Sequence, residues 1–265
     1  MVWNSYFIPK PIDHLTNPEA VTRARENYLA KRPRNLEFLF KKRFDWMNEY
    51  VDGKSVVVDL GCGTGLSCEF IRNPNLMLTD INEYPWIDKK VDALNPPFGD
   101  NSVDVFITSH IIHHLAHPMV FFDNITRMLK PGGYLLIQEL ETSLLLKTLL
   151  RIMKSEGWNS NVDVYNRSVP CTEFAKDPWS ANTAIPHLLF SHPDRFEKEA
   201  KGLKIVRNEL SECLIFPVSG GVLVKVPMPT LPIFALNAID KTDDALISIA
   251  PDLFALGRTV VLQKR

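Results

Sequence analysis

The feature that most constrains this chain is the strand-and-loop segment at residues 56–65, VVVDLGCGTG. A β-branched run leads to Asp59, and glycine then takes alternate positions at Gly61, Gly63 and Gly65. Glycine lets the backbone turn sharply and lets a ligand approach without a Cβ in the way. A helix after such a loop presents free N–H groups. The segment therefore predicts a nucleotide-type cofactor site, in which the loop meets a carboxylate or a ribose.

Around this segment, short β-branched runs alternate with helical stretches between Lys54 and Glu141. Such alternation is typical of βαβ units and a parallel sheet, so the expected fold class is α/β. The expected strands are Ser55–Leu60, Leu76–Asp80, a short one ending near Asp92, Val103–Ser109, Gly133–Glu139, Leu203–Cys213 and Gly257–Gln263. The expected helices are Leu66–Arg72, Met119–Leu129 and Thr142–Ser155, besides one or two before Val51.

Two other nucleotide-binding patterns fit the glycine loop poorly. The dinucleotide fingerprint requires glycine at its first, third and sixth positions, but the sixth position here is Leu66. A phosphate-binding loop requires a glycine that is separated from Gly-Lys-Ser by four residues. Asn48 stands at that place before Gly53-Lys54-Ser55, and a strand follows instead of a helix. An NAD(P)-dependent oxidoreductase is therefore a weaker alternative, and the phosphate-binding loop is rejected.

The segment Asp59-x-Gly61-x-Gly63-x-Gly65 resembles the first motif of class I S-adenosylmethionine-dependent methyltransferases. The resemblance extends over about residues 54–141 in an ordered set of motifs. Asp80 ends the next strand, where the family has the acidic residue that binds both ribose hydroxyls of the cofactor. Asp92-Ala93 resembles the pair that contacts the adenine amine, and Ser109-His110 falls where the fourth strand contacts the methionine end of the cofactor. The later segment Leu129-Lys130-Pro131-Gly132-Gly133 also resembles a segment of the family.

The resemblance implies a Rossmann-like, seven-stranded, mostly parallel sheet with helices on both faces and an antiparallel seventh strand. It implies S-adenosylmethionine as cofactor and methyl transfer as the activity. Asp59 would hold the ammonium of the cofactor or order the loop. The cofactor-binding residues that it implies are Asp59, Gly61, Cys62, Gly63, Gly65, Asp80, Ile81, Asp92, Ala93, Ser109 and His110.

The chain is expected to divide into a helical N-terminal cap at residues 1–53 and the methyltransferase domain at 54–265. Substrate-side insertions are expected at about 156–200 and 213–256, the second of them before the last strand. The first insertion carries aromatic residues that either pack in the core or stack on a sugar or ring. Those singled out are Trp158, Tyr165 and Trp179.

Histidines follow the fourth expected strand at helical spacing. Imidazole has a pKa suited to taking a proton from an acceptor hydroxyl. The candidate general bases are His110, His113 and His114, and the sequence singles out none of them. Glu139 and Glu141, at the end of the fifth strand, either orient the acceptor or face solvent.

No metal site is expected. Pro118 limits the helix that would carry the histidines, and no carboxylate or cysteine stands nearby at a ligand spacing. The four cysteines show neither CxxC spacing nor a paired framework, which fits free thiols in a reducing compartment.

Charge and apolar patterning restrict the acceptor. Lys+Arg 30 against Asp+Glu 31 gives no basic field for nucleic acid. The basic stretch Lys31–Arg43 and the Pro-rich apolar stretch Cys213–Ile239 suggest a membrane surface, although a solvated helix face and extra core are the plainer alternatives. The expected acceptor is a small molecule, a glycan or a lipid-linked compound. Oxygen is the expected methylated atom, on the strength of the histidines alone.

The sequence shows no segment for membrane insertion or secretion. No apolar stretch is long enough for a membrane-spanning helix, and the first residues lack the pattern of a secretory signal. A cytoplasmic protein is expected, with peripheral membrane contact as an open alternative. A cofactor-binding subunit without catalytic activity is the second functional alternative. The oligomeric state is not predicted.

Overall fold

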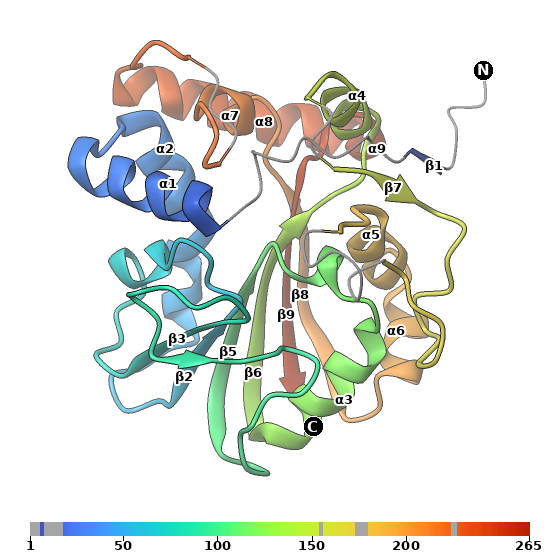
Figure 1. Ribbon diagram of the computed structural model, residues 1–265. Helices are drawn as coiled ribbons and strands as arrows, with labels where there is room; N and C mark the ends of the chain where they lie inside the picture. The colour runs from blue at the N-terminus through green and yellow to red at the C-terminus, as the bar shows by residue number, and fades with distance from the viewer. Residues whose placement is uncertain (1–5, 8–17, 154–155, 173–179, 224–226) are drawn as a thin grey trace.

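A computed structural model describes residues 6–7, 18–153, 156–172, 180–223 and 227–265. Its centre is a seven-stranded sheet in the order β4-β3-β2-β5-β6-β9-β8 (Figure 1). The strands are β2 Val57–Leu60, β3 Leu76–Asp80, β4 Lys89–Lys90, β5 Val103–Ser109, β6 Leu129–Leu140, β8 Leu203–Ser211 and β9 Gly257–Lys264. A separate antiparallel pair joins β1 Tyr6–Phe7 to β7 Trp158–Asn159.

Strand directions confirm the expected mostly parallel sheet. β2 pairs in parallel with both β3 and β5, which places the reversal of strand order beside β2. β9 is antiparallel to both of its neighbours, β6 and β8, as the family resemblance implied for the seventh strand. Open α/β sheets bind ligands at such a reversal, outside the carboxyl ends of the strands.

Helices cover both faces of the sheet, as expected. On one face, α3, α5 and α6 pack on inward residues such as Phe106 and Ile137. On the other face, the N-terminal helices and α8 pack on residues such as Val57, Ile107 and Leu136. The helices are α1 Pro18–Lys31, α2 Arg34–Phe44, α3 Pro118–Met128, α4 Leu144–Met153, α5 Ala184–Phe190, α6 Pro193–Glu199, α7 Ile215–Val218, α8 Ile233–Ile249 and α9 Pro251–Phe254, with the 3₁₀ turns η1 Asp45–Glu49, η2 Leu66–Glu69 and η3 Ile112–His114.

Several boundaries differ from the expectation. The helix expected over Leu66–Arg72 is only the 3₁₀ turn η2, Leu66–Glu69. β6 begins at Leu129, ahead of Gly133, and takes in the Lys-Pro-Gly-Gly segment with a register shift against β5. The prolines of the second insertion do not exclude a long helix, since α8 starts directly after Pro232 and runs for 17 residues.

Most of the basic residues between Lys31 and Arg43 form ion pairs within the protein. Arg32 pairs with Glu69, Lys41 with Glu37, Lys42 with Asp240 and Arg43 with Glu212. This arrangement favours the plainer interpretation, a helix face over core residues. None of the helices in the described ranges is both long and apolar enough to cross a membrane.

The aromatic residues of the first insertion pack inside the molecule. Trp158 and Tyr165 are both buried, so neither offers a free face for stacking on a sugar. Trp179 lies outside the described residues.

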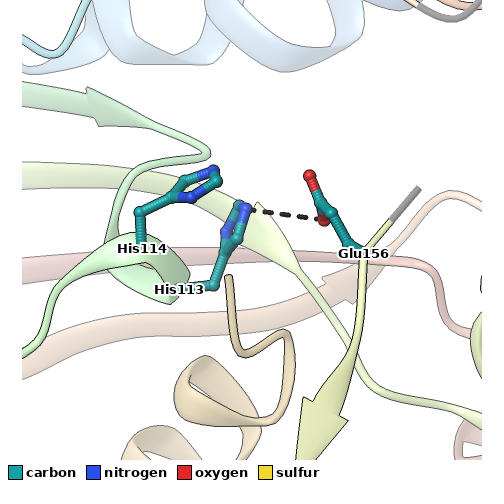
Figure 2. Close-up of side chains that lie close together, drawn as sticks. All are labelled: His113, His114 and Glu156. Atoms are coloured by element: carbon teal, nitrogen blue, oxygen red, sulfur yellow. Dashed lines mark ion pairs between the residues drawn. The ribbon is translucent and has the colours of Figure 1, made fainter. Parts of the chain in front are cut away.

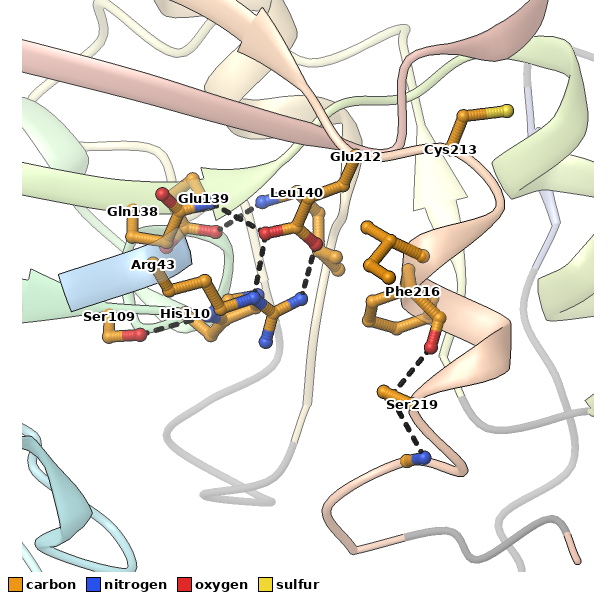
Figure 3. Close-up of polar contacts among 12 residues, drawn as sticks. Arg43, Ser109, His110, Gln138, Glu139, Leu140, Glu212, Cys213, Phe216 and Ser219 are labelled. Atoms are coloured by element: carbon orange, nitrogen blue, oxygen red, sulfur yellow. Dashed lines mark hydrogen bonds and ion pairs between the residues drawn. The ribbon is translucent and has the colours of Figure 1, made fainter. Parts of the chain in front are cut away.

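A buried ion pair joins the N-terminal helices to the far side of the sheet (Figure 3). Arg43, at the end of α2, donates to both carboxylate oxygens of Glu212, from Nε at 2.7 Å and from Nη2 at 2.6 Å. The side chains are only 5% and 1% exposed. A buried charge that loses its partner is costly, so this pair restrains the position of α2.

We expect Arg43→Met to lower the free energy of unfolding by about 3–5 kcal/mol, because it leaves the Glu212 carboxylate buried without its partner. The double variant Arg43→Met/Glu212→Gln should lose less than the sum of the two single variants, as measured by urea unfolding. Arg34→Met, an exposed substitution on the same helix, is the control. Additive losses would show that the two residues are not energetically coupled.

Candidate cofactor and acceptor site

The glycine loop leaves β2 at the carboxyl edge of the sheet. Gly61, Gly63 and Gly65 have φ values of 70°, 50° and 61°. A Cβ at Gly61 would lie 2.4 Å from Cγ2 of Ile111, in the segment after β5. Only glycine therefore fits at this close approach, which sets the loop against the segment that carries the histidines.

Asp80 fastens this loop from the end of β3. Its Oδ2 accepts a hydrogen bond from the Gly63 N–H at 2.9 Å, and its Oδ1 accepts one from the Asn82 N–H at 2.8 Å. Burial raises the pKa of Asp80, and these N–H groups oppose the rise. Burial also raises the pKa of the Cys62 thiol, which keeps this thiol neutral. The sequence-predicted residues of the loop and Asp80 are thus brought together.

Asp59 is buried at the base of the loop. Its Oδ2 accepts a hydrogen bond from the Ser67 hydroxyl, while its Oδ1 has no hydrogen-bond partner among the described residues. Burial raises the pKa of Asp59 to about 7 against the opposing Ser67 hydrogen bond, and the neighbouring charge of Asp80 adds to the rise. An unpaired buried carboxylate oxygen is suited to a cationic group such as an ammonium.

Two residues that the sequence analysis did not single out cover the loop. Trp86 donates from Nε1 to the Gly63 carbonyl at 2.9 Å and stacks on Tyr84. Arg25, on α1, donates to the Thr64 carbonyl at 2.6 Å and lies over the Trp86 ring. No spacing pattern links Arg25 to the loop, because the contact is made only in the folded chain.

The remaining predicted cofactor residues lie along the same edge. Asp92 is exposed and accepts a hydrogen bond from the Leu94 N–H at 2.8 Å, so it caps its own turn. Ala93 packs against the core on the α3 face, and Ile81 directly follows Asp80. The structure places all three near the ends of β3 and β4 and shows no ligand contact for them.

His110 directly follows β5 in a left-handed conformation, with φ of 60°. Its Nδ1 lies 3.0 Å from the Ser109 hydroxyl, and its buried Nε2 has no partner among the described residues. Burial lowers the pKa of His110 well below its ordinary value, and the nearby positive charge of Arg43 adds to this (Figure 3). His110 is therefore a neutral imidazole.

His113 and His114 lie in η3, beside a carboxylate from another part of the chain (Figure 2). Burial disfavours the protonated form of His113, but the Glu139 carboxylate outweighs it and, with Glu156, raises the pKa of His113 to about 9. Burial and the charge of His113 lower the pKa of His114 to about 4. The structure thus separates the three candidate bases by their environments.

Glu139, near the end of β6, and Glu141, directly after the strand, are both buried, so the solvent-facing alternative is wrong. Glu139 accepts hydrogen bonds from the Ile112 N–H and from His113, which places it among the histidines. Glu141 accepts a hydrogen bond from Arg258 Nε at 2.6 Å and pairs with His187. Glu141 is therefore part of a separate internal network.

Comparison with known proteins gives a match over the central part of the chain. Residues 58–137 match the family described as "Methyltransferase domain". The highly reducing polyketide synthase aurA of Calcarisporium arbuscula is 28% identical over 98 residues, which are 36% of this chain and 4% of that protein. The polyketide synthase-nonribosomal peptide synthetase TwmB of Talaromyces wortmannii is 31% identical over 97 residues, 35% of this chain and 3% of that protein. The chain thus spans only a few per cent of the length of these relatives.

Solved structures resemble the chain more weakly. A SAM dependent methyltransferase from Archaeoglobus fulgidus has 21% identity and a TM-score of 0.48, covering 86% of this chain and 93% of that one. One from Aquifex aeolicus has 13% identity and a TM-score of 0.48, covering 94% and 100%. The assignment of the fold rests instead on the sheet order given above.

Residues 58–137 thus match a methyltransferase domain, and the seven-stranded sheet with its antiparallel β9 agrees with the resemblance to class I S-adenosylmethionine-dependent methyltransferases. The cofactor of such a domain is S-adenosylmethionine. The described residues fit this cofactor. The glycine loop offers close approach to its backbone, and Asp59 offers an unpaired carboxylate oxygen for an ammonium. Asp80, with its two acceptor oxygens at the same edge, suits a pair of ribose hydroxyls.

We expect Asp59 to make stability depend on pH. Its pKa is about 7 in the folded chain against 3.8 for the ordinary group, so its contribution is present below about pH 4 and is lost as the pH rises through 7. Asp59→Asn does not titrate, so it should gain stability relative to the unmodified protein between pH 5 and pH 8 in urea unfolding. Asp252→Asn, an exposed change, is the control. A difference that stays constant with pH would contradict the assignment.

Proposed function

We propose that the domain transfers the methyl group of S-adenosylmethionine to an oxygen of a small-molecule, glycan or lipid-linked acceptor. The observation that supports this most is the contact between the glycine loop and the segment after β5. A Cβ at Gly61 would lie 2.4 Å from Ile111, and Ile111 directly precedes the turn that holds His113 and His114. The cofactor loop and the polar acceptor side therefore share one edge of the sheet.

The chain's main contribution would be alignment. The cofactor supplies a methyl group on a positively charged sulfur, and no covalent enzyme residue is needed for an in-line transfer. Holding two reactants in line makes up a large share of catalysis in such reactions. Asp59, Asp80 and the glycine loop would fix the donor, while His110, His113 and His114 are the candidate bases for the acceptor hydroxyl.

Two observations support a small-molecule acceptor. The balanced charge of the chain gives no field for nucleic acid. The curated relatives reported above are named as polyketide synthases, which favours a small organic acceptor over a macromolecule. A cofactor-binding subunit without activity and an NAD(P)-dependent oxidoreductase are the competing proposals.

Titration calorimetry tests the cofactor site first. We expect S-adenosylmethionine and S-adenosylhomocysteine to bind at micromolar concentration, and Asp80→Asn to weaken both more than tenfold because it removes the carboxylate from the ribose position. Asp100→Asn, on the exposed surface, is the matched control and should bind normally. NADH should not bind. Binding of NADH alone would overturn the proposal in favour of an oxidoreductase.

Turnover separates an enzyme from a non-catalytic subunit. Release of S-adenosylhomocysteine is measured with a phenol, a monosaccharide and a short-chain glycolipid as acceptors. We expect release with at least one acceptor and its loss in Asp80→Asn. A protein that binds the cofactor but methylates no acceptor in such a panel would support the subunit alternative.

We also propose that the protein contacts a membrane surface peripherally, through the residues at the beginning of α8. Ile233 and Phe234 are 52% and 77% exposed there. Leu231 bonds Asn35 of α2, which brings exposed Lys31 and Arg34 into the same region of the surface. Apolar side chains beside cations suit an anionic bilayer.

We expect the protein to float with vesicles that contain phosphatidylserine at low salt, and Phe234→Asp to float much less because it places a charge in the contact. Ile152→Asp, which places the same charge at an exposed residue on α4, is the control. Equal flotation of both variants would rule out α8 as the contact.

A further inference from the structure

Two histidines and one glutamate form a cluster on the acceptor side of the sheet (Figure 2). His113 and His114 come from η3, and Glu156 comes from the segment after α4. One potential ligand atom of each residue lies within 4.8 Å of those of the other two. The expectation of no metal assumed that no carboxylate lies near these histidines, and the fold removes that assumption.

The two imidazole rings are held in one orientation by their Nδ1 atoms. His113 Nδ1 lies 2.6 Å from the Glu139 carboxylate, and His114 Nδ1 lies 3.1 Å from the Ser180 carbonyl. Carboxylate and carbonyl oxygens only accept, so both Nδ1 atoms carry the hydrogen. Metal-binding histidines generally donate their second nitrogen to such groups, which leaves Nε2 as the ligand atom.

The Nε2 atom of His113 faces Glu156 across a gap. The distance to Glu156 Oε2 is 3.7 Å, which is too long for a hydrogen bond. Two ligand atoms that share a tetrahedral zinc ion at about 2.0–2.1 Å lie about 3.4 Å apart. A small movement of Glu156, whose side chain is 24% exposed, would bring the two atoms to that separation.

The charge of the site also suits a divalent cation. Glu139 is fully buried and accepts hydrogen bonds from the Ile112 N–H and His113. Glu156 adds a second carboxylate on the opposite side of the His113 ring. Metal binding displaces the Nε2 proton of His113, so the two carboxylates then leave two negative charges, which one divalent ion balances.

We infer that His113, His114 and Glu156 bind a divalent transition-metal ion of the zinc class, with Glu139 and the Ser180 carbonyl orienting the two imidazoles. Three protein ligands leave a coordination position open, as catalytic metal sites do. This inference rests on the proposed function, since the open position would take the acceptor hydroxyl. The acceptor O–H bond then breaks and its proton passes to solvent. The O–CH₃ bond forms, and the S–CH₃ bond of the cofactor breaks with its electron pair left on sulfur.

The test is metal binding by the whole 265-residue chain. Protein treated with EDTA and dialysed is titrated with Zn²⁺ by calorimetry, and with Co²⁺ by visible absorption, which reports coordination geometry. We expect about one equivalent of each metal, and at least a tenfold weaker affinity in Glu156→Gln and His114→Ala. His192→Ala, which removes an exposed histidine at the start of α6, should bind as the unmodified protein does. Circular dichroism checks that each variant is folded.

The result that overturns the inference is substoichiometric binding, or an affinity that Glu156→Gln and His114→Ala leave unchanged. The affinity for S-adenosylmethionine, measured on the same samples, distinguishes failure of the metal site from failure of the proposed function. Normal cofactor binding without metal binding removes only the metal site, whereas a folded protein that does not bind the cofactor contradicts the proposed function.

Discussion

The parallel pairing of β2 with β5 is the constraint on which the site depends. Leu60 pairs with Thr79 of β3 on one side and with Thr108 of β5 on the other, so three strands end at nearly the same level. The glycine loop, the acidic residues and the histidines therefore emerge along one edge. A slip of one residue would turn Asp59 or Ser109 to the opposite face and separate the two halves of the site.

The N-terminal helices tie this edge to the rest of the molecule. Arg25 bonds the glycine loop from α1, and Arg43 pairs with Glu212 beyond β8 from α2. The helical connection expected between β2 and β3 is reduced to η2. The N-terminal helices cover part of the same surface, since residues such as Tyr28 and Phe40 pack in one cluster with Phe70 and the sheet.

The strands and the cofactor loop could be predicted from the sequence, because they depend on local runs and on a motif with fixed spacing. The antiparallel direction of the last strand followed only from the family resemblance. Asp59 and Asp80 are brought together as the motif indicates. Arg25, Trp86 and Glu156 could not be predicted, because each meets the site only through tertiary contacts between distant segments. The long α8 was missed because the prolines before it suggested a broken chain, whereas Pro232 stands at the N-cap, where proline is compatible with a helix start.

Three buried carboxylates lie at this end of the sheet, and they differ in the charge of their partners. Glu212 is matched by the guanidinium of Arg43, and Glu141 by that of Arg258. Glu139 is fully buried too, but its carboxylate accepts hydrogen bonds from two backbone N–H groups and from the imidazole of His113. An imidazole carries a positive charge only when it is protonated, whereas a guanidinium always does. Of these three carboxylates, Glu139 is thus the one that faces a partner without a permanent charge, and it lies on the side of the sheet edge where the acceptor is expected.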